Sequence, residues 1–133
     1  MKITVTNCQS VLRLSRQGVV HLVRFFLNRA RRLNAETPWG TVSVVIANDS
    51  LMRDLNRRFL MRTEPTDVMA FRYRDPLPGS SDGVTAEVVV NAERAKQFSR
   101  GKRHWPACRE LALYLAHACD HLAGAEDATP LQR

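Results

Sequence analysis

The sequence predicts an α/β (α+β) fold in which a small mixed β-sheet of about four strands is flanked by helices. Two observations predict it. Segments with the composition and two-residue period of strands alternate along the chain with segments of helical period. No internal repeat is evident, and 133 residues are enough to bury one hydrophobic core. We therefore expect residues 1–133 to form a single domain.

The first half of the chain predicts two strands and two helices. Residues 2–6 alternate apolar and polar side chains, as a half-buried edge strand does. Between about 15 and 33, apolar residues recur at helical spacing with arginines largely between them, which indicates an amphipathic basic helix. After a turn, the β-branched residues of 41–47 predict a strand. The polar residues 48–50 then begin a helix that reaches about Phe59.

The second half continues the alternation. Residues 66–73 predict a short strand, and the Pro, Gly, Ser and Asp residues of 74–83 predict an exposed loop. Residues 86–90 form a third clear strand and 92–100 a helix.

A last helix follows Pro106, and apolar residues cover most of its circumference, which predicts a helix buried inside the domain. Its histidines His117 and His121 are four residues apart, so both imidazoles leave the helix in nearly the same direction. Gly124 would end the helix, because glycine adopts the left-handed conformation at little cost. The chain turning back there would bring Asp127 over the histidines and complete a set of three metal ligands.

Two histidines and one carboxylate are a common catalytic zinc set, with a fourth position left for water or substrate. They also suit Fe(II), and harder oxygen donors suit Mn²⁺. Hydrolysis is the natural reaction class for such a metal site. The alternative to a metal site is that the two histidines are hydrogen-bonded residues of the core. A zinc peptidase would place Glu directly after the first histidine, where this chain has Ala118. Glu110 would orient an imidazole or form an ion pair near the helix start, and we favour the ion pair.

Composition narrows the class of protein further. Lys and Arg outnumber Asp and Glu by 20 to 13, which gives a net charge of +7. This charge favours an anionic partner such as nucleic acid; the alternative is that it only keeps the protein in solution. No apolar run is long enough to span a membrane, and the first ten residues contain no apolar signal core. Cys8, Cys108 and Cys119 cannot all pair within the chain, which predicts a reducing cytoplasm. We expect Cys108 and Cys119 in the core.

Three blocks of the sequence resemble the YbeY family of bacterial endoribonucleases, which act in ribosomal RNA maturation. They are LNRRFLMRTEPTDVMAF from Leu55, AEVVVNAERA from Ala86 and RELALYLAHACDHLAGAED from Arg109. The first is similar to the family's LN, Tyr-Arg and PTDVLSF, the second to its GDI followed by ERA, and the third to its EL and HGxLHLxGYDH. The resemblance implies an α/β fold, one metal ion taken as zinc and held by three histidines, and a role with the small ribosomal subunit.

The resemblance also assigns the ligands. Two family histidines fall on His117 and His121, and the third falls on Asp127, where a carboxylate can still bind zinc. The Gly after the first family histidine is Ala118, and the Ser of PTDVLSF is Ala70.

The groups that would meet the RNA are less well matched. The family's Arg after the aromatic residue falls on Leu60, which cannot replace a guanidinium, although Arg58 or Arg62 would reach the same space from neighbouring positions. Asp67 and Glu87 match acidic family positions and are weak candidates for catalysis. The alternatives are that Asp67 caps a turn and that Glu87 is a strand residue with a local partner.

The leading hypothesis is a metal-dependent, single-strand-specific endoribonuclease in ribosomal RNA maturation and small-subunit quality control, with a metal-bound water attacking the phosphodiester. Its cofactor would be one divalent ion, zinc in the first instance. Its partners would be ribosomal RNA and the small ribosomal subunit or its proteins, and the chain would be a monomer. One alternative is a non-catalytic RNA- or ribosome-binding member of the same fold whose metal site has drifted, as Leu60, Ala70 and Asp127 suggest. Another is a metal-dependent hydrolase of a small substrate.

Overall fold

The structure is a computed structural model that describes residues 1–34, 39–61, 66–74, 84–100, 105–124 and 131–132. Within these residues, five strands form one mixed sheet with four helices packed around it, which confirms the predicted fold class. In chain order the elements are β1 (Lys2–Asn7), α1 (Arg16–Asn34), β2 (Trp39–Ala47), α2 (Asp49–Leu60), β3 (Val68–Arg74), β4 (Val84–Asn91), α3 (Ala92–Arg100), α4 (Ala107–Gly124) and β5 (Leu131–Gln132).

The strand order is β1-β2-β4-β3-β5, so β1 is an edge strand as expected. The first three strands of this order run parallel to one another, and β3 runs antiparallel to both β4 and β5. The second halves of β2 and β4 are mostly covered on both faces, which is why 44–47 and 88–90 read as unbroken apolar runs. The two-residue β5 was not predicted, because two residues carry no period.

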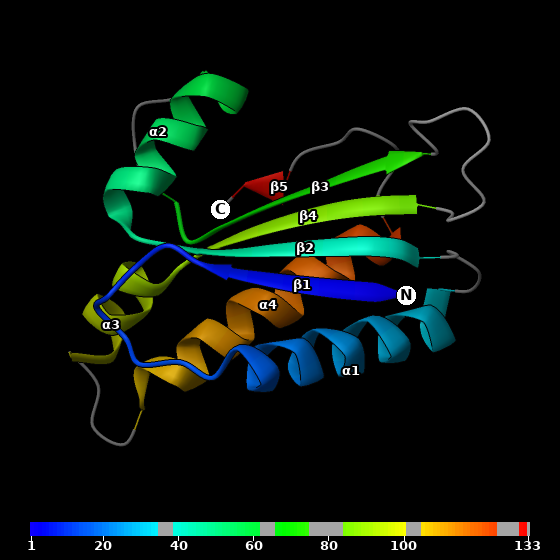
Figure 1. Ribbon diagram of the computed structural model, residues 1–133, viewed down its shortest axis with the longest axis horizontal. Coiled ribbons are helices and arrows are strands. Elements are labelled where there is room, and N and C mark those ends of the chain that lie inside the picture. Colours follow the sequence, from blue (N-terminus) through cyan, green and yellow to red (C-terminus); the bar gives the residue numbers. More distant parts are fainter. Residues whose placement is uncertain (35–38, 62–65, 75–83, 101–104, 125–130, 133) are drawn as a thin grey trace.

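The helices form two layers (Figure 1). Helices α1 and α4 lie side by side on one face of the sheet, and α2 packs on the other face. Helix α3 follows β4 directly and contacts α4 at one end of the sheet. Among the described residues, no helix is both long enough and apolar enough to cross a bilayer.

Polar side chains fix where the helices begin. The Oγ of Ser15 accepts a hydrogen bond of 3.0 Å from the backbone N–H of Gly18 before α1. The Oδ1 of Asn48 accepts one of 2.9 Å from the N–H of Leu51, which confirms the predicted start of α2. At its other end, α2 stops at Met61, whose φ of 55° is left-handed.

The larger part of the core lies between the sheet and the α1–α4 pair. Leu115 and Leu122 of α4, 1% and 0% exposed, pack there with the inward residues of β2 and β4. Cys119 is buried as predicted, but Cys108 is exposed, so that prediction was wrong. Cys108 lies in the first turn of α4, and the turns that carry most of the helix's buried residues follow it.

Candidate functional site

The predicted ligand helix is α4, and it is not buried all round. Glu110, Tyr114, His117 and His121 fall within about 60° of one another around the helix axis. His117 is exposed and His121 is half-buried, whereas Glu110 and Tyr114 are buried. The face that carries the histidines therefore lies at the border between the core and the solvent, where an ion or a substrate can approach.

The buried half of this face is held by hydrogen bonds. The Nε1–H of Trp105 donates to Oε1 of Glu110 over 3.1 Å, and Glu110 also shares a hydrogen bond with Tyr114. Burial raises the pKa of Tyr114 well above its ordinary value, and the hydrogen bond and charge of Glu110 raise it further. Among the described residues, Glu110 therefore has Trp105 and Tyr114 as partners rather than the ion pair that we expected.

Strand β3 runs beside α4 and brings further polar groups to it. Asp67, just before β3, is close enough to Tyr114 for its negative charge to raise the pKa of that phenol. Near the other end of the strand, the buried Arg72 donates from Nη1 to the backbone oxygen of Leu122 over 2.9 Å. His117 lies between these two contacts along the helix, so the pair His117 and His121 is on the part of α4 that accompanies β3.

The donors that the structure describes fit two positions of a divalent metal. Two imidazoles one helical turn apart, one exposed and one half-buried, are a chemically suitable pair for zinc or a related ion. The third predicted ligand, Asp127, lies outside the described residues. Within those residues there is no cluster of three or more His, Cys, Asp or Glu side chains that could hold a metal.

The other predicted site residues lie elsewhere. Glu87 is exposed on the α2 face of the sheet, opposite α4, so the structure does not bring it to the histidines. Arg62 lies outside the described residues. Ala70 is 0% exposed and packs in the core. Of the acidic candidates that the structure describes, Asp67 and Glu87, only Asp67 is brought to the α4 side.

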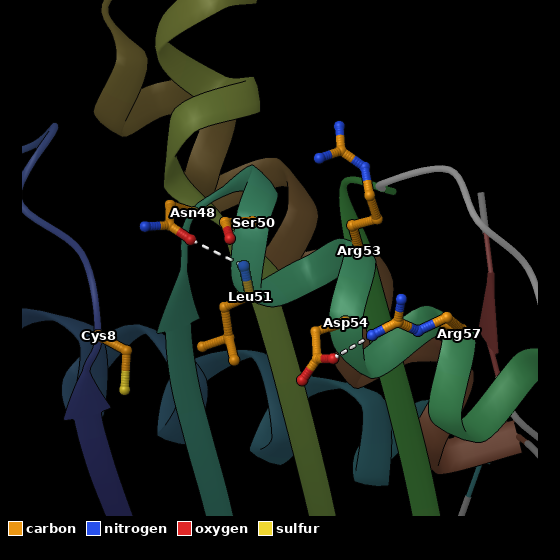
Figure 2. A pocket seen from close by; sticks show the side chains of 7 residues that line it. All are labelled: Cys8, Asn48, Ser50, Leu51, Arg53, Asp54 and Arg57. Carbon is orange, nitrogen blue, oxygen red and sulfur yellow. Dashed lines mark hydrogen bonds and ion pairs between the residues drawn. The ribbon is translucent and has the colours of Figure 1, made fainter.

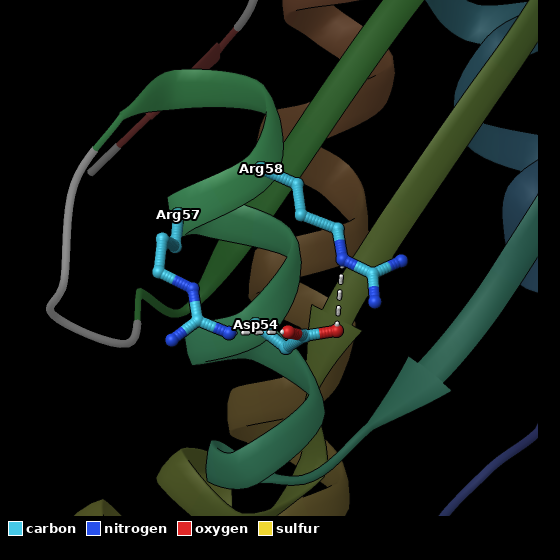
Figure 3. Close-up of polar contacts among 3 residues, drawn as sticks. All are labelled: Asp54, Arg57 and Arg58. Atoms are coloured by element: carbon cyan, nitrogen blue, oxygen red, sulfur yellow. Dashed lines mark hydrogen bonds and ion pairs between the residues drawn. The ribbon is translucent and has the colours of Figure 1, made fainter.

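Arg58 belongs to a small charged cluster on α2. In Figure 3 the carboxylate of Asp54 lies between the guanidinium groups of Arg57 and Arg58. Its Oδ1 is 2.9 Å from Nη2 of Arg57 and its Oδ2 is 3.3 Å from Nε of Arg58. Both arginine side chains are 67% exposed, so solvent screens these pairs. The cluster presents cations to the solvent in a fixed arrangement.

A cavity of about 640 Å³ lies next to this cluster, at the carboxyl ends of β1 and β2 (Figure 2). Cys8 extends from the chain just after β1, and the remaining lining residues come from α2 and its N-cap. Arg53 makes no hydrogen bond or ion pair with the rest of the described chain. The sequence did not predict this cavity, because Cys8 and Arg53 are brought together only by the pairing of β1 with β2.

The comparisons with known proteins agree with the resemblance read from the sequence. The family model described as Endoribonuclease YbeY matches residues 4–133. The chain belongs to the YbeY family. The three YbeY-like blocks lie on α2 and β3, on β4 and α3, and on α4, and these elements contact one another in the fold.

Relatives in this family are moderately similar. The chain is 32% identical over 92 residues to the Endoribonuclease YbeY of Carboxydothermus hydrogenoformans, which covers 69% of this chain and 62% of the relative. It is 34% identical over 95 residues to the Endoribonuclease YbeY of Rhodopirellula baltica, and the match covers 71% of this chain and 47% of that relative. It is 30% identical over 139 aligned positions to that of Rhodococcus opacus, covering 98% and 73%. The chain thus spans less than two thirds of the length of the first two relatives.

A solved structure supports the fold. The solution structure of TM1509 from Thermotoga maritima matches with a TM-score of 0.51 over 94% of this chain and 73% of that one. The two sequences are 19% identical, so this likeness concerns the fold alone.

Proposed function

We propose that this YbeY-family chain is a metal-dependent endoribonuclease that cleaves single-stranded RNA. The observation that carries the proposal is the pair His117 and His121, one turn apart on an accessible face of α4. The name of the relatives, endoribonuclease, supports RNA as the substrate, and the net charge of +7 favours a polyanion. By the same resemblance we propose a cytoplasmic monomer that acts on ribosomal RNA with the small ribosomal subunit or its proteins.

In this proposal His117, His121 and Asp127 hold one divalent ion, with zinc favoured by the two nitrogen donors and one oxygen donor. When bound, such an ion supplies a Lewis acid and lowers the pKa of a coordinated water. The fold contributes rigidity. Arg72 ties the end of α4 to β3 through the Leu122 carbonyl, so the backbone next to His121 is fixed.

The start of α4 is fixed as well, because α3 packs against α4 and Leu111, 2% exposed, belongs to the core. The ligand pair therefore lies on a helix that is held at both ends, which limits how far the imidazoles move apart in the metal-free protein. The exposed arginines of α2 attract the phosphates of the RNA backbone and offset their charge.

A second candidate is a non-catalytic RNA- or ribosome-binding member of the family with a drifted metal site. Leu60 favours it, because no guanidinium stands at the family's Arg position. Ala70 also favours it, since this fully buried residue supplies no hydroxyl. Such a protein would bind RNA in a salt-sensitive way without turnover, and a chelator would not change that binding.

The test is the metal content of protein purified without added metal, measured by elemental analysis. Wild type is expected to hold about one ion per chain, and His117→Ala and Asp127→Ala are expected to lose it. His21→Ala is the matched control, because His21 is an exposed histidine on the side of α1 opposite the buried residues of that helix. Cleavage of a single-stranded RNA should require the ion and fail in the same two variants.

Two results would contradict the proposal. A wild-type protein that is metal-free and takes up neither zinc nor manganese would give the lead to the binding-only candidate. RNA cleavage that persists unchanged in Asp127→Ala would show that this carboxylate is not needed.

A further inference from the structure

Three aromatic side chains form a continuous feature on the face of the sheet opposite α4. Phe59 is in the last turn of α2, and Phe71 and Tyr73 are two residues apart on β3, so they point to the same face. The ring centroids of Phe59 and Phe71 are 6.0 Å apart, with the planes tilted by 57°. We call Phe59, Phe71 and Tyr73 the aromatic strip.

The strip is exposed although the core beneath it is complete. Phe59 is 62% exposed and Tyr73 is 39% exposed, whereas Met69 and Val89 next to them are 0% and 7% exposed. Phe59 and Tyr73 therefore contribute little to sealing the core, whereas Phe71 is half-buried and packs against it. Large exposed aromatic side chains that are not needed for packing indicate a surface that contacts another molecule.

A cavity of about 230 Å³ lies along the strip, between α2 and the sheet. It is smaller than the range of about 300–1,000 Å³ typical of sites for drug-sized ligands, so it suits one flat ring better than a whole cofactor. Its apolar floor has a polar edge. Glu87 of β4 stands directly across from Phe71 in the antiparallel register and beside Ser43 of β2, so the three side chains share this face.

The charges around the strip indicate which partner it takes. The helix that carries Phe59 also presents Arg58, which directly precedes Phe59 and is 67% exposed, and the whole chain has a net charge of +7. Cations beside exposed aromatic rings are the combination by which proteins hold single-stranded nucleic acid, with phosphates on the cations and bases on the rings. The carboxylate of Glu87 repels phosphate, which places the backbone on the arginine side and the bases on the strip.

We propose that the aromatic strip is a base-stacking subsite for single-stranded RNA, separate from the histidine pair on α4. The proposal rests on the proposed function, because it takes RNA as the ligand. Only unpaired bases can use the strip, since the bases of a duplex are already stacked on their neighbours. Phe71 and Tyr73 are separated by about 6.6 Å along the strand, which allows each ring to take its own base.

The strip is tested by binding, with a chelator present so that no RNA is cleaved. The full chain is titrated against a short unpaired RNA that carries a fluorescent 2-aminopurine base. Wild type is expected to quench this fluorescence by stacking. Phe59→Leu and Tyr73→Leu, which keep apolar bulk but lose the ring, are expected to bind about 5- to 30-fold more weakly and to restore the fluorescence.

Two controls separate stacking from a general loss of structure. Phe25→Leu is matched, because Phe25 on α1 is 59% exposed, close to the 62% of Phe59, but lies on the other side of the sheet; it should bind as wild type does. Tyr73→Phe keeps the ring and should also bind normally. An abasic RNA of the same length should bind wild type, Phe59→Leu and Tyr73→Leu equally, since it has no bases to stack.

Two results would contradict the stacking subsite. One is an RNA affinity of Phe59→Leu and Tyr73→Leu equal to that of wild type. The other is a loss of affinity for the abasic RNA in these variants as large as the loss for the normal RNA. A change in self-association on sedimentation with no change in RNA affinity would mean that the face is a protein interface. These outcomes are distinct from failure of the proposed function. If wild type cleaves RNA in a metal-dependent way but Phe59→Leu and Tyr73→Leu bind RNA normally, only the stacking subsite is contradicted. If RNA bases stack on the strip but no RNA is cleaved, only the proposed nuclease activity is contradicted.

Discussion

The two faces of the sheet differ in how completely helices cover them. On one face, α1 and α4 cover residues such as Val44 and Val88, both 0% exposed. On the other face, α2 covers Met69, but Tyr73 of β3 stays 39% exposed and Phe59 of α2 itself 62% exposed. Figure 1 shows α1 and α4 running along the first face and α2 at one end of the second.

This difference in helix cover determines how much a substitution on each face should change the stability of the fold. The face under α1 and α4 is an ordinary close-packed core, where a lost side chain leaves a cavity. The face under α2 keeps the rings of Phe59 and Tyr73 in contact with water, so replacing those two rings should cost little stability. The histidine pair belongs to neither interior, since it lies on the flank of the helix that covers the first face.

The largest expected effect tests the covered face. Leu115→Ala should lower the free energy of unfolding by about 2–5 kcal/mol, because Leu115 is 1% exposed and its loss leaves a cavity against the sheet. Urea unfolding followed by circular dichroism measures it. Leu113→Ala is the matched control: Leu113 is on the same helix but 48% exposed, and its replacement should change the value by no more than about 0.5 kcal/mol. Equal losses would mean that α4 does not pack as described.

A smaller effect tests the link between β3 and α4. Arg72→Leu should cost about 1.5–3 kcal/mol, because it removes the buried charged donor to the Leu122 carbonyl. Arg58→Leu, on the open face, should cost about 0–1 kcal/mol, since that arginine is exposed and its partner Asp54 is screened by solvent. Thermal unfolding of both variants checks the contrast. A cost for Arg72→Leu as small as that for Arg58→Leu would contradict the link.

The elements that the sequence predicted correctly are those whose pattern is local. The β-branched runs of β2 and β4 and the period of α1 are visible within a few residues, and Asn48 is a cap that acts over three positions. Positions at the ends of elements were harder. Cys108 was expected in the core because its neighbours are apolar, but the first turn of α4 leaves it exposed.

The candidate site divides in the same way. That His117 and His121 share one face of α4 could be predicted, because a spacing of four residues fixes their common direction on a helix. Arg72 and Leu122 are 50 residues apart, and Phe59 meets Phe71 only because α2 folds back over β3. Glu87 was taken with the acidic candidates, yet the strand order turns it to the open face, a result that depends on register rather than on local spacing.

The smallest expected effect concerns the two tyrosines, one on each side of the sheet. Burial raises the pKa of Tyr73 above its ordinary 10.0, and the negative charge of Glu87 raises it further. Glu87→Gln should therefore lower the pKa of Tyr73 and leave Tyr114, whose acidic neighbours are Glu110 and Asp67, unchanged. Ultraviolet titration of the phenols measures both, with Tyr73→Phe to assign the signals.

The sign for stability follows from the same shift. Because the folded pKa of Tyr73 lies above the unfolded value of 10.0, the neutral phenol stabilises the fold fully below pH 10. That contribution is lost as the pH rises through the pKa of Tyr73 in the folded protein. Between neutral and alkaline pH, the free energy of unfolding should therefore fall less in Glu87→Gln than in wild type. If the titration of Tyr73 is the same with and without the Glu87 carboxylate, the two side chains do not share the cavity beside the strip, and the polar edge assigned to it is wrong.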